Sequence, residues 1–129
     1  MNYINIESKK HKEIIDITDI INEILNKQNK DSGLVHIFAL HTTCALTTAD
    51  LDPGTDLDYL DTLEKIVPKL NFRHPHNPNH FPNHFLSSLI GTSLSIPFEN
   101  KNLLLGTWQR VVLIELDGPR IRNLKINII

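Results

Sequence analysis

Four histidines and three prolines fall within residues 74–84, a density that no packed core requires. Imidazole binds zinc and similar metals, and it transfers protons near neutral pH. Composition alone leaves two interpretations open, a metal or acid–base site and a merely solvated polar loop. The four candidates are His74, His76, His80 and His84.

The prolines determine the shape of this segment. Each one removes a backbone donor, fixes φ and disfavours helix at the preceding residue, so residues 74–81 should form an extended or turning loop. In an extended chain, residues two apart point the same way, which places His74 and His76 on one side. Pro82 suits the first turn of a helix, and apolar residues then recur at helical spacing. We therefore expect His84 near a helix N-terminus.

A second group of polar residues begins at His41. Residues 34–40 are nearly all apolar, which predicts a strand covered on both faces with His41 at its C-terminal end. Carboxylates from Asp50, Asp52 or Asp56 could join the imidazoles in a zinc-type site, whereas an oxygen-only cluster would suit Mg²⁺. The same aspartates suit a turn or the start of a helix, so both roles stay open.

Other reactive residues carry weaker signals. Cys44 is the only cysteine, which excludes an intrachain disulfide and a multi-cysteine zinc site. Strand geometry puts Cys44 and His41 on opposite faces, so we do not expect a thiol nucleophile. Trp108 follows Gly106 closely and could lie in the core or beside a polar site. The basic residues Arg73 and Arg120 can bind phosphate or can be ordinary surface charges.

The elements that must position these residues follow an α+β pattern. Hairpins dominate, which favours a largely antiparallel or mixed sheet carrying two to three helices in a single domain, residues 1–129. Expected strands cover residues 2–7, 13–18, 34–40, 44–48, 93–96, 103–105, 110–116 and 121–129, with a turn over residues 50–54.

Two longer helices are expected besides the short one after Pro82. Thr18 can cap the first, whose apolar face comprises Ile20, Ile21, Ile24 and Leu25. Thr55 can cap the second, and Pro68 stops it. The expected buried stripe of this second helix consists of Leu57, Leu60, Leu63, Ile66 and Val67.

Bulk composition limits the function. The chain has 129 residues, 40% of them hydrophobic, and a formal net charge of −2, so no basic stripe for nucleic acid is present. No apolar run is long enough for a membrane span or resembles a signal peptide. We expect a soluble, cytoplasmic protein that binds neither nucleic acid nor membrane.

Several short motifs then occur in a recognisable order between residues 35 and 120. They are His41-Thr42-Thr43 with a following Leu-Thr, Arg73-His74, His84 before residues 87–94, Ile96-Pro97, Gly106-Thr107-Trp108-Gln109 and Asp117-Gly118-Pro119-Arg120. With these motifs the chain resembles the YjbQ-type family, small proteins known as secondary thiamine-phosphate synthases. Ala49-Asp50 stands where many members carry Asn-Glu. Either Asp50 or Asp52 could therefore supply the carboxylate of the site.

The resemblance implies an α+β homotrimer whose histidines and acidic residues line a polar site able to hold a metal. It also implies a transferase that joins a pyrimidine methyl diphosphate to a thiazole phosphate with release of pyrophosphate, aided by Mg²⁺. Two alternatives remain: a metal-dependent hydrolase of small phosphorylated molecules, with Zn²⁺ or a similar ion at the histidines, and a non-catalytic trimeric metal- or ligand-binding protein.

The predicted site residues fall into three roles, which combine the residue types with the resemblance. The catalytic candidates are His41, Asp52, Asp56 and Gln109. The candidates for binding a small phosphorylated substrate are Arg73, Thr107 and Trp108. The metal ligands are His74 and His84, with His76 and His80 as weaker candidates.

Overall fold

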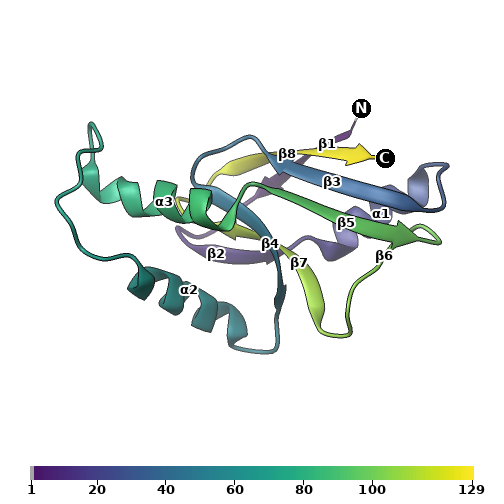
Figure 1. Cartoon of the computed structure of the whole chain (residues 1–129), viewed down its shortest axis with the longest axis horizontal. Coiled ribbons are helices and arrows are strands. Elements are labelled where there is room, and N and C mark those ends of the chain that lie inside the picture. Colours follow the sequence, from purple (N-terminus) through teal and green to yellow (C-terminus); the bar gives the residue numbers. More distant parts are fainter. Residues whose placement is uncertain (1) are drawn as a thin grey trace.

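Eight strands form two antiparallel sheets that face each other across the main hydrophobic core, in a computed structural model that describes residues 2–129 (Figure 1). One sheet has five strands in the order β1-β8-β3-β5-β6, and the other has three in the order β2-β7-β4. The strands are β1 (Asn2–Glu7), β2 (Glu13–Asp16), β3 (Gly33–Ala39), β4 (Cys44–Asp50), β5 (Ser93–Glu99), β6 (Asn102–Leu103), β7 (Gln109–Glu115) and β8 (Ile121–Ile128). The predicted α+β class is confirmed.

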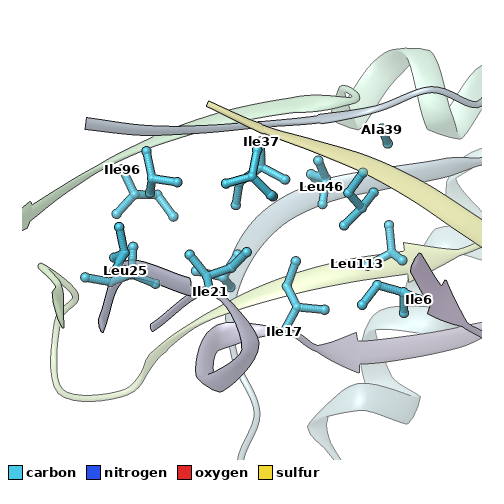
Figure 2. Close-up of a cluster of buried hydrophobic side chains, with 14 of the residues drawn as sticks. Ile6, Ile17, Ile21, Leu25, Ile37, Ala39, Leu46, Ile96 and Leu113 are labelled. Atoms are coloured by element: carbon cyan, nitrogen blue, oxygen red, sulfur yellow. The ribbon is translucent and has the colours of Figure 1, made fainter. Parts of the chain in front are cut away.

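Side chains from both sheets and from one helix build the main core (Figure 2). Ile37 comes from the five-stranded sheet, and Leu46 and Leu113 come from the three-stranded sheet. Helix α1 (Thr18–Lys27) adds Ile21 and Leu25. All five side chains are buried, so the two sheets and α1 are held together by one apolar contact region.

The prediction that β3 is covered on both faces is wrong. Val35, Ile37 and Ala39 are buried, but Leu34 and Phe38 are exposed on the opposite face, where no helix packs within the described chain. Strand residues alternate between faces, so a run of apolar residues can still have one face in water.

The expected cap of α1 is also wrong, although the helix itself is confirmed. The capping position is Ile17, and the Asp16 carboxylate accepts hydrogen bonds from the Thr18 amide at 3.0 Å and from its hydroxyl at 2.7 Å. The Thr18 hydroxyl in turn accepts from the Val111 amide of β7 at 2.8 Å. Thr18 therefore ties the helix to the sheet, while Asp16 supplies the cap.

Helix α2 (Thr55–Ile66) is present, but its predicted buried stripe is wrong because none of its residues is buried. Leu57 and Ile66 are exposed, and only half-buried residues such as Leu63 reach the second apolar cluster. Gly54 precedes the helix with a φ of 87°, so a glycine turn takes the place of the predicted Thr55 cap. Figure 1 shows α2 at one end of the molecule, beside the three-stranded sheet.

The histidine-rich segment forms a loop, as predicted, with a short 3₁₀ turn over Pro78–His80. Helix α3 (Phe81–Ile90) follows, with Pro82 in its first turn. α3 packs on β4: Leu86 and Ser87 are buried, and the Ser87 hydroxyl donates to the Cys44 carbonyl at 2.6 Å. This contact fixes His84, one turn earlier on the helix, relative to the start of β4.

Several boundaries differ from the predictions. β4 continues to Asp50, which therefore ends a strand instead of beginning a turn. β5 runs to Glu99, and the predicted strand at residues 103–105 is reduced to β6. No helix within residues 2–129 is long and apolar enough to cross a membrane.

Candidate functional site: the histidine cleft

A polar cleft of about 430 Å³ opens where β3 passes into β4. His41, Thr42 and Thr43 connect these strands, and His80 and His84 approach from the 3₁₀ turn and α3. Its remaining lining residues are Leu40, Asp117, Arg120 and Arg122. We call this the histidine cleft. It combines imidazole, guanidinium and carboxylate groups, which can bind anions and move protons.

His41 is held as a neutral imidazole. The backbone amide of Asn123 donates a 2.8 Å hydrogen bond to its Nε2, which must therefore be unprotonated. Burial lowers the pKa of His41, and the positive charges of Arg122 and Arg120 lower it further, against a smaller opposing effect of Glu115. The proton of the neutral ring thus sits on Nδ1, and His41 offers the cleft a hydrogen-bond donor.

His84 and His74 are oriented the other way. Nδ1 of His84 lies 3.1 Å from the Thr42 carbonyl, and Nδ1 of His74 lies 3.0 Å from the Asn77 carbonyl. A carbonyl oxygen only accepts, so both Nδ1 atoms carry hydrogen and both Nε2 atoms keep a free lone pair when the rings are neutral. The two ring centroids lie 4.8 Å apart, with the ring planes tilted by 31°. Metal-binding histidines show the same anchoring of one ring nitrogen by a carbonyl.

A buried ion pair lies behind the cleft, and its arginine, Arg122, lines the cleft. Glu115 is fully buried and Arg122 is 2% exposed, and Arg122 Nε donates to Glu115 Oε1 at 2.9 Å. The Ser8 hydroxyl donates to the same oxygen at 2.6 Å. Arg122 Nη2 contacts Glu115 Oε2 and donates to the Thr43 carbonyl at 2.9 Å. The pair thus joins β7 and β8 to the segment that carries His41.

Both members of the pair are ionised. Burial alone would raise the pKa of Glu115, but hydrogen bonds from Arg122 and Ser8 hold it below its ordinary value. Burial would lower the pKa of Arg122, but its bonds to Glu115 raise it. Sequence reasoning missed both residues. The available signal was Glu115 itself, a lone carboxylate inside the apolar run of residues 111–116.

Arg120 lies at the exposed side of the cleft. Its Nε donates to the Asp117 carbonyl at 2.7 Å, and its Nη2 donates to the Asp117 carboxylate at 2.9 Å. The rest of the guanidinium is available to a ligand. Cys44 is buried, and burial raises the pKa of its thiol to about 11, which disfavours the thiolate form that a nucleophile needs.

Four other predicted site residues lie at the far end of β4: Asp52, Thr107, Trp108 and Gln109. Cys44 pairs with Glu115 beside the histidine cleft, whereas Asp50 pairs with Gln109 at the other end of the same ladder. The two ends of the strand are six residue steps apart, which corresponds to roughly 20 Å. Within one chain, the structure therefore does not bring the aspartates and the 106–109 motif to the histidines.

This far end has its own polar surface. Asp50, Asp52, Thr107 and Trp108 line a small hollow of about 210 Å³. Trp108 is 70% exposed, so it is not a core residue. Gln109 binds locally, since its Nε2 donates to the Thr48 hydroxyl at 2.9 Å and its Oε1 accepts from the Gly106 amide at 3.0 Å.

Three predicted residues belong to neither group. Asp56 lies in the first turn of α2, half-buried. Arg73 is exposed and lies outside the lining of the histidine cleft. His76 is exposed, with a φ of 70°, and does not share a side with His74 in the manner of an extended chain. Within residues 2–129, no three His, Cys, Asp or Glu side chains lie close enough together to hold a metal ion.

The fold and the cleft define a class of small α+β proteins with two antiparallel sheets and histidines at a strand junction. The sequence model of the UPF0047 protein YjbQ-like family matches residues 2–129. The chain therefore belongs to the UPF0047/YjbQ family, and the expected family membership is confirmed.

Relatives from both archaea and bacteria match nearly the whole chain. A UPF0047 protein of Archaeoglobus fulgidus is 35% identical over 121 residues, covering 93% of this chain and 94% of its own length. YugU of Bacillus subtilis, another UPF0047 protein, is 32% identical over 121 residues, covering 93% and 92%.

Solved structures show the same fold. An uncharacterised YjbQ/UPF0047 protein from Clostridium acetobutylicum superposes with a TM-score of 0.90 at 32% identity, covering 100% of both chains. A YbjQ-like protein of unknown function from Sulfolobus solfataricus also gives a TM-score of 0.90, at 28% identity and covering 98% of this chain and 94% of its own.

Proposed function

We propose that this protein is an enzyme that binds a small phosphorylated substrate in the histidine cleft. The observation that carries the proposal is the fixed orientation of the two imidazoles, with a donor at Nδ1 of His41 and a free lone pair at Nε2 of His84. Arg120 adds a guanidinium that Asp117 holds in place. A phosphate oxygen can accept hydrogen bonds from the first and the third of these groups.

Donor geometry matters more than net charge here. Two arginines, Arg120 and Arg122, face two carboxylates, Glu115 and Asp117, so the cleft carries no surplus charge from these four groups. Binding of an anion would rest on directed donors, which cost little reorganisation because their partners already hold them. Neutral His41 contributes a donor without adding a charge.

The reaction we propose is the one implied by the family resemblance, a thiamine-phosphate synthase reaction. The thiazole nitrogen forms a bond to the pyrimidine methylene while the bond from that carbon to the diphosphate oxygen breaks, and pyrophosphate leaves. Negative charge grows on the diphosphate, where Arg120 and the Nδ1–H of His41 would stabilise it. Mg²⁺ would bind mainly through diphosphate oxygens and water, and Asp117 is a carboxylate that lines the cleft.

A second candidate function is metal-dependent hydrolysis of a small phosphorylated molecule. The anchored Nδ1 atoms of His74 and His84, whose ring centroids lie 4.8 Å apart, favour it, because free imidazole Nε2 atoms suit Zn²⁺ better than Mg²⁺. Such an ion would lower the pKa of a bound water. The remaining ligands would be water, substrate oxygens or side chains from another copy of the chain.

The proposal includes a homotrimer. In such an assembly, a neighbouring copy could supply Asp52 to the histidine cleft, although the two are remote within one chain. Light scattering should give a mass three times that of the 14.8 kDa chain. If the site is shared, mixing inactive His84→Ala and Asp52→Asn copies should restore part of the activity. A monomeric mass would remove this part of the proposal.

The direct test is an assay with the pyrimidine diphosphate and thiazole phosphate substrates in Mg²⁺, beside a panel of phosphate esters with and without chelator. We expect Arg120→Ala and His84→Ala to lose most turnover. His36→Ala, on the outer face of β3, is the matched control and should keep it. Absence of turnover on every substrate, with Zn²⁺ binding retained, would instead identify a non-catalytic binding protein.

A further inference from the structure

A crevice beneath α2 has no role in the proposed reaction. One hollow, of about 560 Å³, lies between the chain around the end of α2, the start of α3 and the turn between β1 and β2. A second, of about 230 Å³, lies between α2 and the three-stranded sheet. Leu63 lines both, so the two hollows adjoin. We call them together the α2 crevice.

The floor of the α2 crevice is apolar. Leu63, Val67, Phe72 and Leu86 line the larger hollow, and Ile90 and Val112 contribute to the smaller one. Protein interiors are normally packed with few voids. The larger hollow, of about 560 Å³, instead falls in the range of pockets that hold small ligands, about 300–1,000 Å³. The loose packing of α2, with no buried residue, is what leaves this space.

The rim of the larger hollow is basic. Lys12 and Lys69 face one acidic residue, Glu64, and the imidazoles of His11 and His80 also line the hollow. Two lysines against one glutamate leave one surplus positive charge, although the whole chain carries −2. Within residues 2–129, neither lysine forms an ion pair.

From this arrangement we infer that the α2 crevice binds an amphipathic carboxylate, with its apolar body against Leu63 and its head group at Lys12 and Lys69. Charge complementarity selects an anionic head, and the apolar floor selects a chain or ring body. The inference goes beyond the proposed reaction, and the crevice is separate from the histidine cleft except that His80 lines both.

Fluorescence of anilinonaphthalene sulfonate, an apolar anion, gives the binding assay. We expect one saturable site per chain, with decanoate displacing the dye and decyltrimethylammonium, of equal chain length and opposite charge, failing to do so. The Lys12→Glu, Lys69→Glu double variant should weaken dye and decanoate binding by roughly tenfold. Lys125→Glu, on the outer face of the five-stranded sheet, reverses the charge of one lysine away from the crevice and should have no effect.

Filling the crevice gives a second, independent test. Leu63→Phe should abolish most of the binding, whereas Leu57→Phe on the exposed side of α2 should not. Thermal unfolding checks that Leu63→Phe folds, and the lysine variants test the site without altering its packing. Equal displacement by the cationic amphiphile, or unchanged binding in folded Leu63→Phe, would overturn the inference. So would a fall in molecular mass in the lysine variants, since the crevice would then contact a second copy. None of these outcomes depends on synthase or hydrolase activity.

Discussion

Replacing Glu115 by Gln tests the buried ion pair behind the histidine cleft. The substitution keeps the shape of the side chain but leaves Arg122, 2% exposed, without its counter-charge. Breaking one partner of a buried pair costs about 3–5 kcal/mol, because the remaining charge cannot return to water. For a chain of 129 residues this corresponds to a fall in Tm of roughly 11–18 °C.

Urea unfolding followed by circular dichroism measures this loss as a change in midpoint. The matched control is Glu99→Gln, at the end of β5, where an exposed carboxylate should contribute less than about 0.5 kcal/mol. Replacing Glu115 and Arg122 together by apolar residues should cost less than the sum of the two single losses. A Glu115→Gln midpoint equal to that of the wild type would refute the buried pair.

The pH dependence provides a second measurement of the same pair. The pKa of Glu115 is depressed in the folded protein, so the unfolded chain binds its proton more readily. The stability from ionised Glu115 is therefore fully present above its ordinary pKa of 4.5 and is lost as the pH falls through the depressed folded value. Glu115→Gln should remove this acid-dependent part of the unfolding curve.

Three further predictions concern single side chains. Burial raises the pKa of Cys44 to about 11, so a thiol reagent at pH 8 should label it only after unfolding, and rapid labelling of the native protein would contradict its burial. By nitrogen-15 NMR, neutral His41 should carry its proton on Nδ1 and titrate below its ordinary pKa of 6.5. Its neutral form therefore stabilises the fold above pH 6.5, and this contribution is lost as the pH falls through the lowered value. Calorimetry with Zn²⁺ should show affinity reduced by roughly tenfold or more in His84→Ala but unchanged in His76→Ala, and equal losses would argue against an anchored pair at His74 and His84.

Most helices and strands could be predicted from the sequence, because their formation depends on residues that are neighbours in the chain. The strand before His41, the helix after Pro82 and the loop between His74 and His80 follow from apolar spacing and proline geometry. Burial could not be predicted so well. Leu34 and Phe38 look like core residues in sequence, but whether a second layer covers that face of β3 depends on where α1 and the other sheet pack.

The candidate site shows the same limit. His41 and His84 lie 43 residues apart, and the structure brings both to one cleft because α3 packs on β4. Asp52 is much nearer to His41 in sequence, yet a seven-residue strand carries it to the opposite end of the sheet. The prediction that Asp52 and His41 share one site failed within one chain, because a strand lies between the two residues. Glu115 and Arg122 escaped notice because a buried charge pair is defined by its partners, which only the fold provides.

The weak attachment of α2 also has a consequence for hydrogen exchange. A helix with no buried residue exposes little new apolar surface when it detaches, so its opening should require far less free energy than global unfolding. The backbone amides of α2 should exchange faster than those of β7. One face of β7 is buried in the first apolar cluster and the other face in the second. This end of the molecule can thus open and close while the two sheets stay intact, which gives a molecule in solution a route into the space beneath the helix.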